Sequence, residues 1–227
     1  MGTVYELTPS WGGGWTQTVL YSADPEDSIH PRGGVVFDGS GSSSGNLYGV
    51  LTGGTDPPFC AAAVFELSPG GSGWTEQTLV CFNYYQSGTL YTYGSPQAGL
   101  IIDRSGNLYG TAQAAFKLTS TNGNWSFNDL TGLGGTPYAK LVMDSAGNLY
   151  GTTSDGGAYG NGNVFKLTLS NGDWTYTSLY DFTGGTDGST PVSNVVFDAN
   201  GNLYGTTLFG GNDGCPSGCG VIWEIMP

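Results

Sequence analysis

The stretch DSAGNLYGTT at residues 144–153 is one of four near-identical copies in a chain of 227 residues. The other copies are GNLYGV at 45–50, GNLYGT at 106–111 and GNLYGT at 201–206. Their spacing is uneven, at roughly 40–60 residues, so a coiled-coil or collagen period is excluded and a structural repeat with loops of variable length is indicated.

Each copy lies among short apolar segments that have the composition of β-strands. AKLVMD (139–144) leads into the motif, and NVFKLTL (163–169) and DWTYTSLYDF (173–182) follow it. Runs or alternations of Val, Ile, Phe, Tyr, Trp and Thr are typical of strands. Asp-x-x-Gly-Asn and Asn-Gly sequences between the segments are typical of tight turns. Each repeat is therefore predicted to be a four-stranded antiparallel meander, and no window predicts a helix of ordinary length.

Several such meanders bury both of their faces when they pack around an axis as the blades of a β-propeller. We predict one all-β domain over 1–227 with four blades, in which the motif leucines point to one face and the motif tyrosines to the other. The valine or isoleucine of each inner strand is expected at a matching position: Val36, Ile101, Val142 and Val196. The repeats span approximately 33–82, 98–130, 139–182 and 193–227, with 2–22 as a partial repeat.

The two ends of the chain are incomplete repeats. Residues 2–9 and 14–22 match the third and fourth strands of a blade, and residues 220–227 match a third strand without a fourth. We predict that 14–22 pairs with 220–227 and closes the ring. One third-strand segment is then surplus, so it either lies displaced on the surface or pairs with another copy of the chain. The second alternative is self-association by exchange of terminal strands.

Charge restricts the classes of partner. The chain has 18 acidic residues against five Lys and Arg, a net charge of −13. Nucleic acids and anionic lipid surfaces are excluded as partners, because they require clustered basic side chains. No apolar run reaches the length of a membrane span, so membrane insertion is not expected. No signal peptide is visible, and residues 1–9 begin inside a repeat, so we expect a chain trimmed from a longer one.

The four cysteines are Cys60, Cys81, Cys215 and Cys219. Zinc ligation and disulfide formation are both open. We favour the pairs Cys60–Cys81 and Cys215–Cys219, because the single His and the C-x3-C spacing fit a zinc site poorly. Disulfides predict an extracellular or cell-surface location.

The repeat resembles the GloVer-type tandem repeats of bacterial extracellular β-propeller-like proteins. The residues that carry the resemblance are LVMDSAGNLYGTT (141–153), GNVFKLT (162–168) and DWTYTSLYDF (173–182). A more distant similarity, through the turn before the motif, is to NHL-type propeller repeats. The resemblance implies a secreted or surface-anchored propeller, and it carries over no catalytic residues.

The long connections of a propeller blade lie on one rim, and here they hold aromatic and acidic residues. A sugar ring stacks on an aromatic face while its hydroxyls donate to carboxylates and amides, so we expect carbohydrate or a cell-surface partner to bind there. The alternative is that the tyrosines only cover loop backbone. The candidate residues are Tyr84, Tyr85, Tyr91, Tyr93, Tyr138, Tyr159, Asp155, Asp187, His30 and Arg32.

His30 and Arg32 lie near Asp24, Glu26 and Asp27 in the sequence. A histidine among carboxylates suits a general base or a metal ligand, although a solvated loop is the simpler interpretation. Calcium is possible in the acidic loops, but no EF-hand pattern is present, and no cofactor is expected. A binding module is favoured over the two alternatives, an assembly unit and a glycan-active hydrolase or lyase that uses rim carboxylates.

Overall fold

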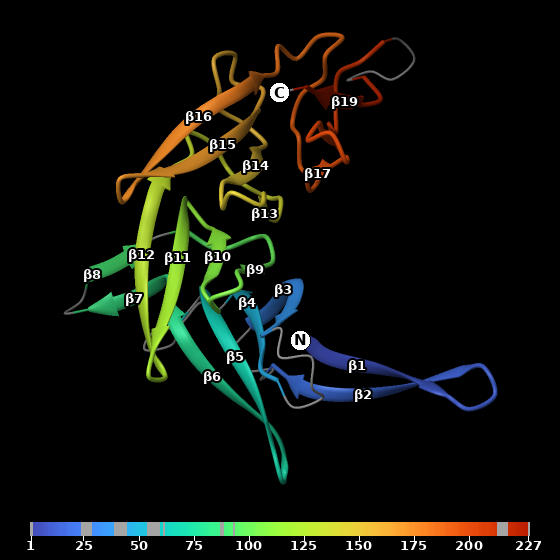
Figure 1. Cartoon of the computed structure of the whole chain (residues 1–227), viewed down its shortest axis with the longest axis vertical. Helices are drawn as coiled ribbons and strands as arrows, with labels where there is room; N and C mark the ends of the chain where they lie inside the picture. Colours follow the sequence, from blue (N-terminus) through green and yellow to red (C-terminus); the bar gives the residue numbers. More distant parts are fainter. Residues whose placement is uncertain are drawn as a thin grey trace.

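The structure is a computed structural model that describes residues 2–23, 29–38, 45–53, 60, 62–86, 89–92, 94–212 and 218–226, with the backbone alone at 29 and 83–92. The described residues form strands, turns and loops without a helix, as the sequence predicts. Four antiparallel sheets follow one another as the blades of a β-propeller (Figure 1).

Each blade is a meander in chain order. Blade 1 consists of β3 (Ile29–Phe37), β4 (Leu47–Gly53), β5 (Ala62–Gly70) and β6 (Gly73–Cys81). Blade 2 consists of β9 (Ile101–Ile102), β10 (Leu108–Thr111), β11 (Ala114–Thr121) and β12 (Asn124–Gly132). Blade 3 consists of β13 (Val142–Met143), β14 (Leu149–Thr153), β15 (Asn163–Ser170) and β16 (Asp173–Asp181). Blade 4 consists of β17 (Val196–Phe197), β18 (Leu203–Thr206) and β19 (Ile222–Ile225).

The repeat register matches the prediction. The expected inner-strand residue pairs with the motif tyrosine in every blade: Val36 with Tyr48, Ile101 with Tyr109, Val142 with Tyr150 and Val196 with Tyr204. The motif leucine and tyrosine of one blade lie in different core clusters, since Tyr109 packs towards blade 3 and Leu108 towards blade 1. The core is therefore a series of layers between successive blades.

Two hairpins lie outside the four blades. β1 (Thr3–Ser10) pairs with β2 (Gly14–Ser22), and β7 (Asn83–Gln86) pairs with β8 (Thr89–Thr92). The β7–β8 hairpin was not predicted; it lies in the connection between blades 1 and 2. β3 also begins earlier than expected, so His30 and Arg32 belong to a strand and pair with Thr52 and Val50.

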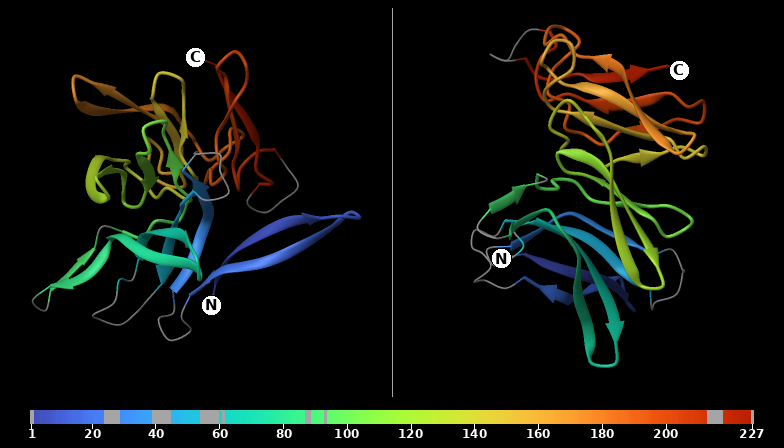
Figure 2. Two further views of the ribbon diagram at one scale, coloured as in Figure 1. Left: turned by 60° about the horizontal axis from the view of Figure 1, so that its bottom comes forward. Right: turned by 90° about the vertical axis from the view of Figure 1, so that its left-hand side faces the viewer.

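The predicted closure of the ring is wrong. β2 pairs with β1 and β19 pairs with β18, and no pairing joins β2 to β19 among the described residues. The local pairing is favoured because only a short turn separates β1 from β2, so its closure entropy is small. Buried Val4 then holds the hairpin on blade 1, in a cluster with Leu47 and Phe65. The described blades form an arc, and the hairpin projects from its first blade (Figures 1 and 2).

Candidate functional site

The long connections between strands lie side by side along one rim, as predicted. The Ser154 backbone N–H donates to the Thr136 carbonyl over 2.8 Å, which joins the connection inside blade 3 to the one that enters it. Ser189 and Phe209 exchange backbone hydrogen bonds of 2.9 and 3.1 Å at the next blade. The rim is thus a set of loops that pair with one another.

An open pocket of about 590 Å³ lies on this rim between blades 2 and 3. We call it the rim pocket. Its polar side chains include those of Ser95, Gln97, Gln113 and Thr136, and Tyr138 supplies an exposed aromatic ring. Its lining contains no Asp, Glu, His, Lys or Arg among the described residues. Amides, a hydroxyl and a phenol ring in a neutral pocket suit a neutral, hydroxyl-rich ligand.

Glycines allow the loops to approach closely enough to form this pocket. A Cβ at Gly135 would lie 2.1 Å from the carbonyl oxygen of Asp155, and one at Gly94 would lie 2.7 Å from the backbone nitrogen of Gln113. Neither contact is tolerated by a larger residue without movement of backbone. The glycines of the rim therefore let neighbouring loops pack backbone against backbone, a role that the high glycine content of the sequence does not by itself reveal.

Tyr138 reaches the pocket because of the residue before it. Pro137 is buried, and the connection then turns into the inner strand of blade 3 with the tyrosine side chain exposed. A Pro-x pair precedes the inner strands of blades 2, 3 and 4, at 96–97, 137–138 and 191–192, and the equivalent pair at 31–32 lies within β3. Sequence reasoning identified Tyr138 but missed Gln97, and this recurring pair was the signal that would have found it.

The two candidate carboxylates are engaged inside the loops. Asp155 accepts hydrogen bonds from the Thr136 backbone N–H at 2.6 Å and from the Thr136 hydroxyl at 3.0 Å. Asp187 accepts from the Thr183 backbone N–H at 2.8 Å, the Thr183 hydroxyl and the Tyr180 hydroxyl at 3.0 Å. For Asp187, burial alone would raise the pKa, but the bonds from Thr183 and Tyr180 outweigh it and lower the pKa. Both side chains fasten loops in this structure.

The remaining candidates do not join the rim pocket. Arg32 lines a separate, mostly apolar pocket of about 440 Å³ between the β1–β2 hairpin and blade 1, and His30 is exposed two residues earlier on β3. Tyr159 is exposed on the connection inside blade 3. Tyr84, Tyr85 and Tyr91 belong to the β7–β8 hairpin, where the structure describes the backbone alone. The residues predicted here that lie outside the described part of the chain are Tyr93, Asp24, Glu26 and Asp27.

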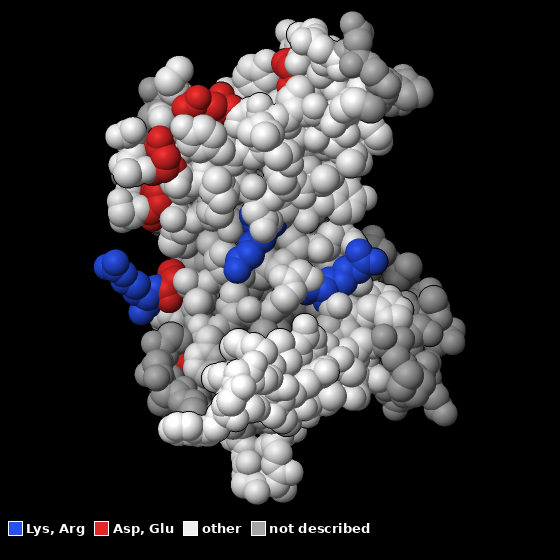
Figure 3. All heavy atoms as spheres, turned by 90° about the vertical axis from the view of Figure 1, so that its right-hand side faces the viewer, with Lys and Arg blue, Asp and Glu red and all other residues white. Residues whose placement is uncertain are grey.

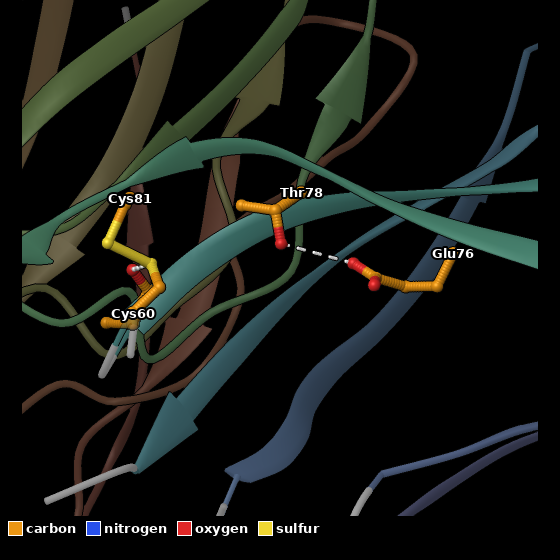
Figure 4. Close-up of a disulfide and its surroundings, with 5 residues drawn as sticks. Cys60, Glu76, Thr78 and Cys81 are labelled. Atoms are coloured by element: carbon orange, nitrogen blue, oxygen red, sulfur yellow. Dashed lines mark hydrogen bonds between the residues drawn. A yellow bond between two sulfur atoms is a disulfide. The ribbon is translucent and has the colours of Figure 1, made fainter. Parts of the chain in front are cut away.

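The Cys60–Cys81 disulfide is formed, with 5.5 Å between the two Cα atoms (Figure 4). It attaches the connection before β5 to the end of β6. Cys219 is also disulfide-bonded, and Cys215 lies outside the described residues. A disulfide is consistent with a location outside the cytosol.

No three His, Cys, Asp or Glu side chains are grouped closely enough to hold a metal ion in the described part of the chain. None of its elements is a helix with the length and apolar character needed to cross a bilayer.

Comparison with known proteins gives a family and a fold. The family model described as the Gloeobacter/Verrucomicrobia repeat matches residues 113–227, half of the chain. A gluconolactonase from Xanthomonas campestris, described as important in glucose secondary metabolic pathways, has a similar structure with a TM-score of 0.52 at 13% identity. That similarity covers 96% of this chain and 63% of the other, so this chain spans less than two thirds of its length.

A protein of unknown function from Dyadobacter fermentans has a TM-score of 0.46 at 12% identity, with 79% of this chain and 62% of the other covered. No curated protein matches the sequence. At 13% identity the similarity to the Xanthomonas campestris protein concerns the fold alone.

Proposed function

We propose that this chain, which belongs to the Gloeobacter/Verrucomicrobia repeat family, is an extracellular or cell-surface module that binds neutral carbohydrate in the rim pocket. The observation that carries the proposal is the exposed ring of Tyr138 beside Gln97, Gln113 and Thr136. A pyranose ring presents a C–H face that packs on a phenol ring and hydroxyls that donate to and accept from amides. The structurally similar protein of Xanthomonas campestris is a gluconolactonase important in glucose secondary metabolic pathways, which agrees with the proposed ligand class.

Binding is favoured over hydrolysis by the chemistry of the pocket lining. A glycosidase of the usual kind needs two carboxyl groups on either side of the scissile bond. The rim pocket has no carboxyl group in its described lining. Asp155 accepts two hydrogen bonds from Thr136 of the neighbouring connection, and Asp187 accepts its hydrogen bonds from Thr183 and Tyr180, close to it in the sequence. The described lining of the pocket offers contacts for a ligand but not the pair of carboxyl groups that hydrolysis needs.

The test is an array of neutral oligosaccharides of glucose, mannose, xylose and galactose, followed by calorimetry on the ligands that bind. Tyr138→Ala is expected to weaken binding at least fivefold, since a stacking contact of roughly 1 kcal/mol is removed. Its melting temperature should stay near that of the wild type because the ring is exposed. Tyr159→Ala is the matched control, an exposed tyrosine outside the pocket, and should bind normally.

Two results would contradict the proposal. One is the absence of binding to every sugar on the array at millimolar concentration. The other is equal loss of affinity in the Tyr138→Ala and Tyr159→Ala variants, which would place the ligand elsewhere on the rim.

A further inference from the structure

Every blade-to-blade interface in the arc is built by the same rule. Two side chains of each blade face the next blade: the motif tyrosine, and the residue that precedes the aromatic residue of the third strand. In blade 2 these are Tyr109 and Ala115. The next blade presents its motif leucine and its aromatic in return, as Leu149 and Phe165 do in blade 3. The same arrangement joins blade 1 to blade 2 and blade 3 to blade 4.

A tryptophan completes two of these interfaces. Trp125, at the start of β12, packs edge-on against Tyr48 of the preceding blade with 5.5 Å between ring centroids. Trp174, at the start of β16, packs in the same way against Tyr109 at 6.3 Å. The outer hairpin of one blade thus covers the motif tyrosine of the blade before it.

The β1–β2 hairpin has the structure of such an outer hairpin. Tyr5 pairs with Val19 and Pro9 with Trp15, in the register in which Phe65 pairs with Thr78 and Pro69 with Trp74 in blade 1. Both hairpins have an irregularity at the same place, after Val4 and after Val64. β2 also lies against β6 of blade 1, just as β6 lies against β12 of blade 2.

The face of the hairpin that would meet a preceding blade is uncovered. Val4 is buried against blade 1, whereas Tyr5, Leu7 and Val19 are half exposed, and Tyr5 and Leu7 also line the open pocket between the hairpin and blade 1. Trp15, the equivalent of Trp125 and Trp174, is 68% exposed. Residues 2–22 carry a single charged side chain, Glu6, in a chain of net charge −13. Figure 3 looks onto the side from which the hairpin projects, and mostly uncharged side chains cover the lower half of that face.

The last blade has the complementary face, also uncovered. Ile222 occupies the position of Val164, which is completely buried against blade 4, yet Ile222 is 84% exposed. Val196 is exposed on the same face of the sheet, and the motif tyrosine Tyr204 has no tryptophan packed on it among the ring contacts of the described residues. Blade 4 therefore presents the surface that every other blade uses to receive its successor.

We propose that these two faces bind each other between copies of this chain, with the β1–β2 hairpin of one copy on blade 4 of the next and Trp15 on Tyr204. Within one chain the contact is disfavoured, because Val4 holds the hairpin on blade 1, and blade 1 and blade 4 lie towards opposite ends of the long axis of the molecule (Figure 1). No strand leaves its sheet, in contrast to the strand exchange suggested by the sequence. The interface is heterologous, so it generates rings or filaments.

The test is light scattering coupled to size exclusion over a concentration series to several hundred micromolar. The wild type should exceed the monomer mass of 23.5 kDa as concentration rises. Added salt should promote the association, because it screens the repulsion between copies that each carry a charge of −13. Leu7→Asp and Ile222→Asp should each weaken association at least tenfold, with little change in melting temperature because both side chains are exposed. Tyr159→Asp, an exposed change on the rim, is the control and should associate like the wild type.

Mixing the two variants gives the sharper result. A Leu7→Asp copy keeps its blade 4 face and an Ile222→Asp copy keeps its hairpin face, so an equimolar mixture should form dimers and nothing larger. The proposal is overturned if the wild type stays monomeric throughout the series. It is equally overturned if both variants associate normally, or if the mixture behaves like the separate variants.

Discussion

The two glycines of the GNLYG motif are required for different physical reasons. Gly147 has a φ of +86°, in the turn that leads into β14, and a Cβ there would meet nothing within 4 Å. Gly151 is not in the positive-φ region; a Cβ there would lie 2.7 Å from a ring carbon of Phe165, its partner across the strand pair. The equivalent glycines of the other blades face Phe65, Phe116 and Trp223 in the same way.

Alanine at each position should therefore destabilise the fold differently. We expect Gly147→Ala to cost about 1–2 kcal/mol through backbone strain. Gly151→Ala should cost about 1–3 kcal/mol, since the fully buried Phe165 has no room to move. The double variant Gly151→Ala with Phe165→Leu separates the mechanisms, because removing the ring should recover part of the loss. Urea unfolding measures all three variants, and no recovery in the double variant would contradict the steric explanation.

The turn before each motif depends on an ionised aspartate. Asp144 accepts hydrogen bonds from the backbone N–H groups of Ala146 and Asn148, from the Asn148 amide at 2.7 Å and from the Tyr150 hydroxyl at 3.0 Å. Burial by itself raises the pKa of Asp144, but these hydrogen bonds outweigh burial and hold the pKa below its usual range. The same holds for Asp103 and Asp198 in their turns.

Acid should loosen the blades through these turns. A carboxyl whose pKa is lowered by folding stabilises the protein above its unfolded pKa of about 3.9, and that contribution is lost as the pH falls towards the folded value. We expect the free energy of unfolding to drop below about pH 4. Asp144→Asn should be less stable at pH 7 by about 1 kcal/mol, and its stability should fall less steeply in acid. An unchanged pH dependence would show that other groups control acid unfolding.

At the scale of the whole molecule, stability comes from layers between blades. Val164 and Ile222 hold the same place in their repeats, but only Val164 has a following blade packed over it. Val164→Ala should therefore cost about 2 kcal/mol through lost burial and the cavity that remains. Ile222→Ala should change stability by less than about 0.5 kcal/mol. Thermal melts at micromolar concentration, where self-association is weak, measure both; a large effect at Ile222 would mean that a part of the chain covers it.

The sequence alone was sufficient for everything that repeats. Four occurrences of the motif and the apolar segments around it predicted the strand order, the blade count and the matching positions of Val142 and its equivalents in the blades, because alternation and turn chemistry are local properties. The Cys60–Cys81 pair was also predicted. At the rim, Tyr138 was predicted as an exposed ring. Whether Tyr138 contacts a ligand stays a prediction.

Tertiary structure decided what does not repeat. Whether the ring closes depends on which partner β2 pairs with, either β1 across a short turn or the edge of β19 in blade 4. Sequence patterns do not reveal the difference in free energy between these two pairings. In the sequence, Asp155 and Asp187 look like carboxylates that are available to bind a ligand. Only the folded loops show that threonine side chains and backbone N–H groups already donate hydrogen bonds to them. The rim pocket is likewise invisible in the sequence, since Gln97, Gln113 and Tyr138 come from three connections that only the packing of neighbouring blades brings together.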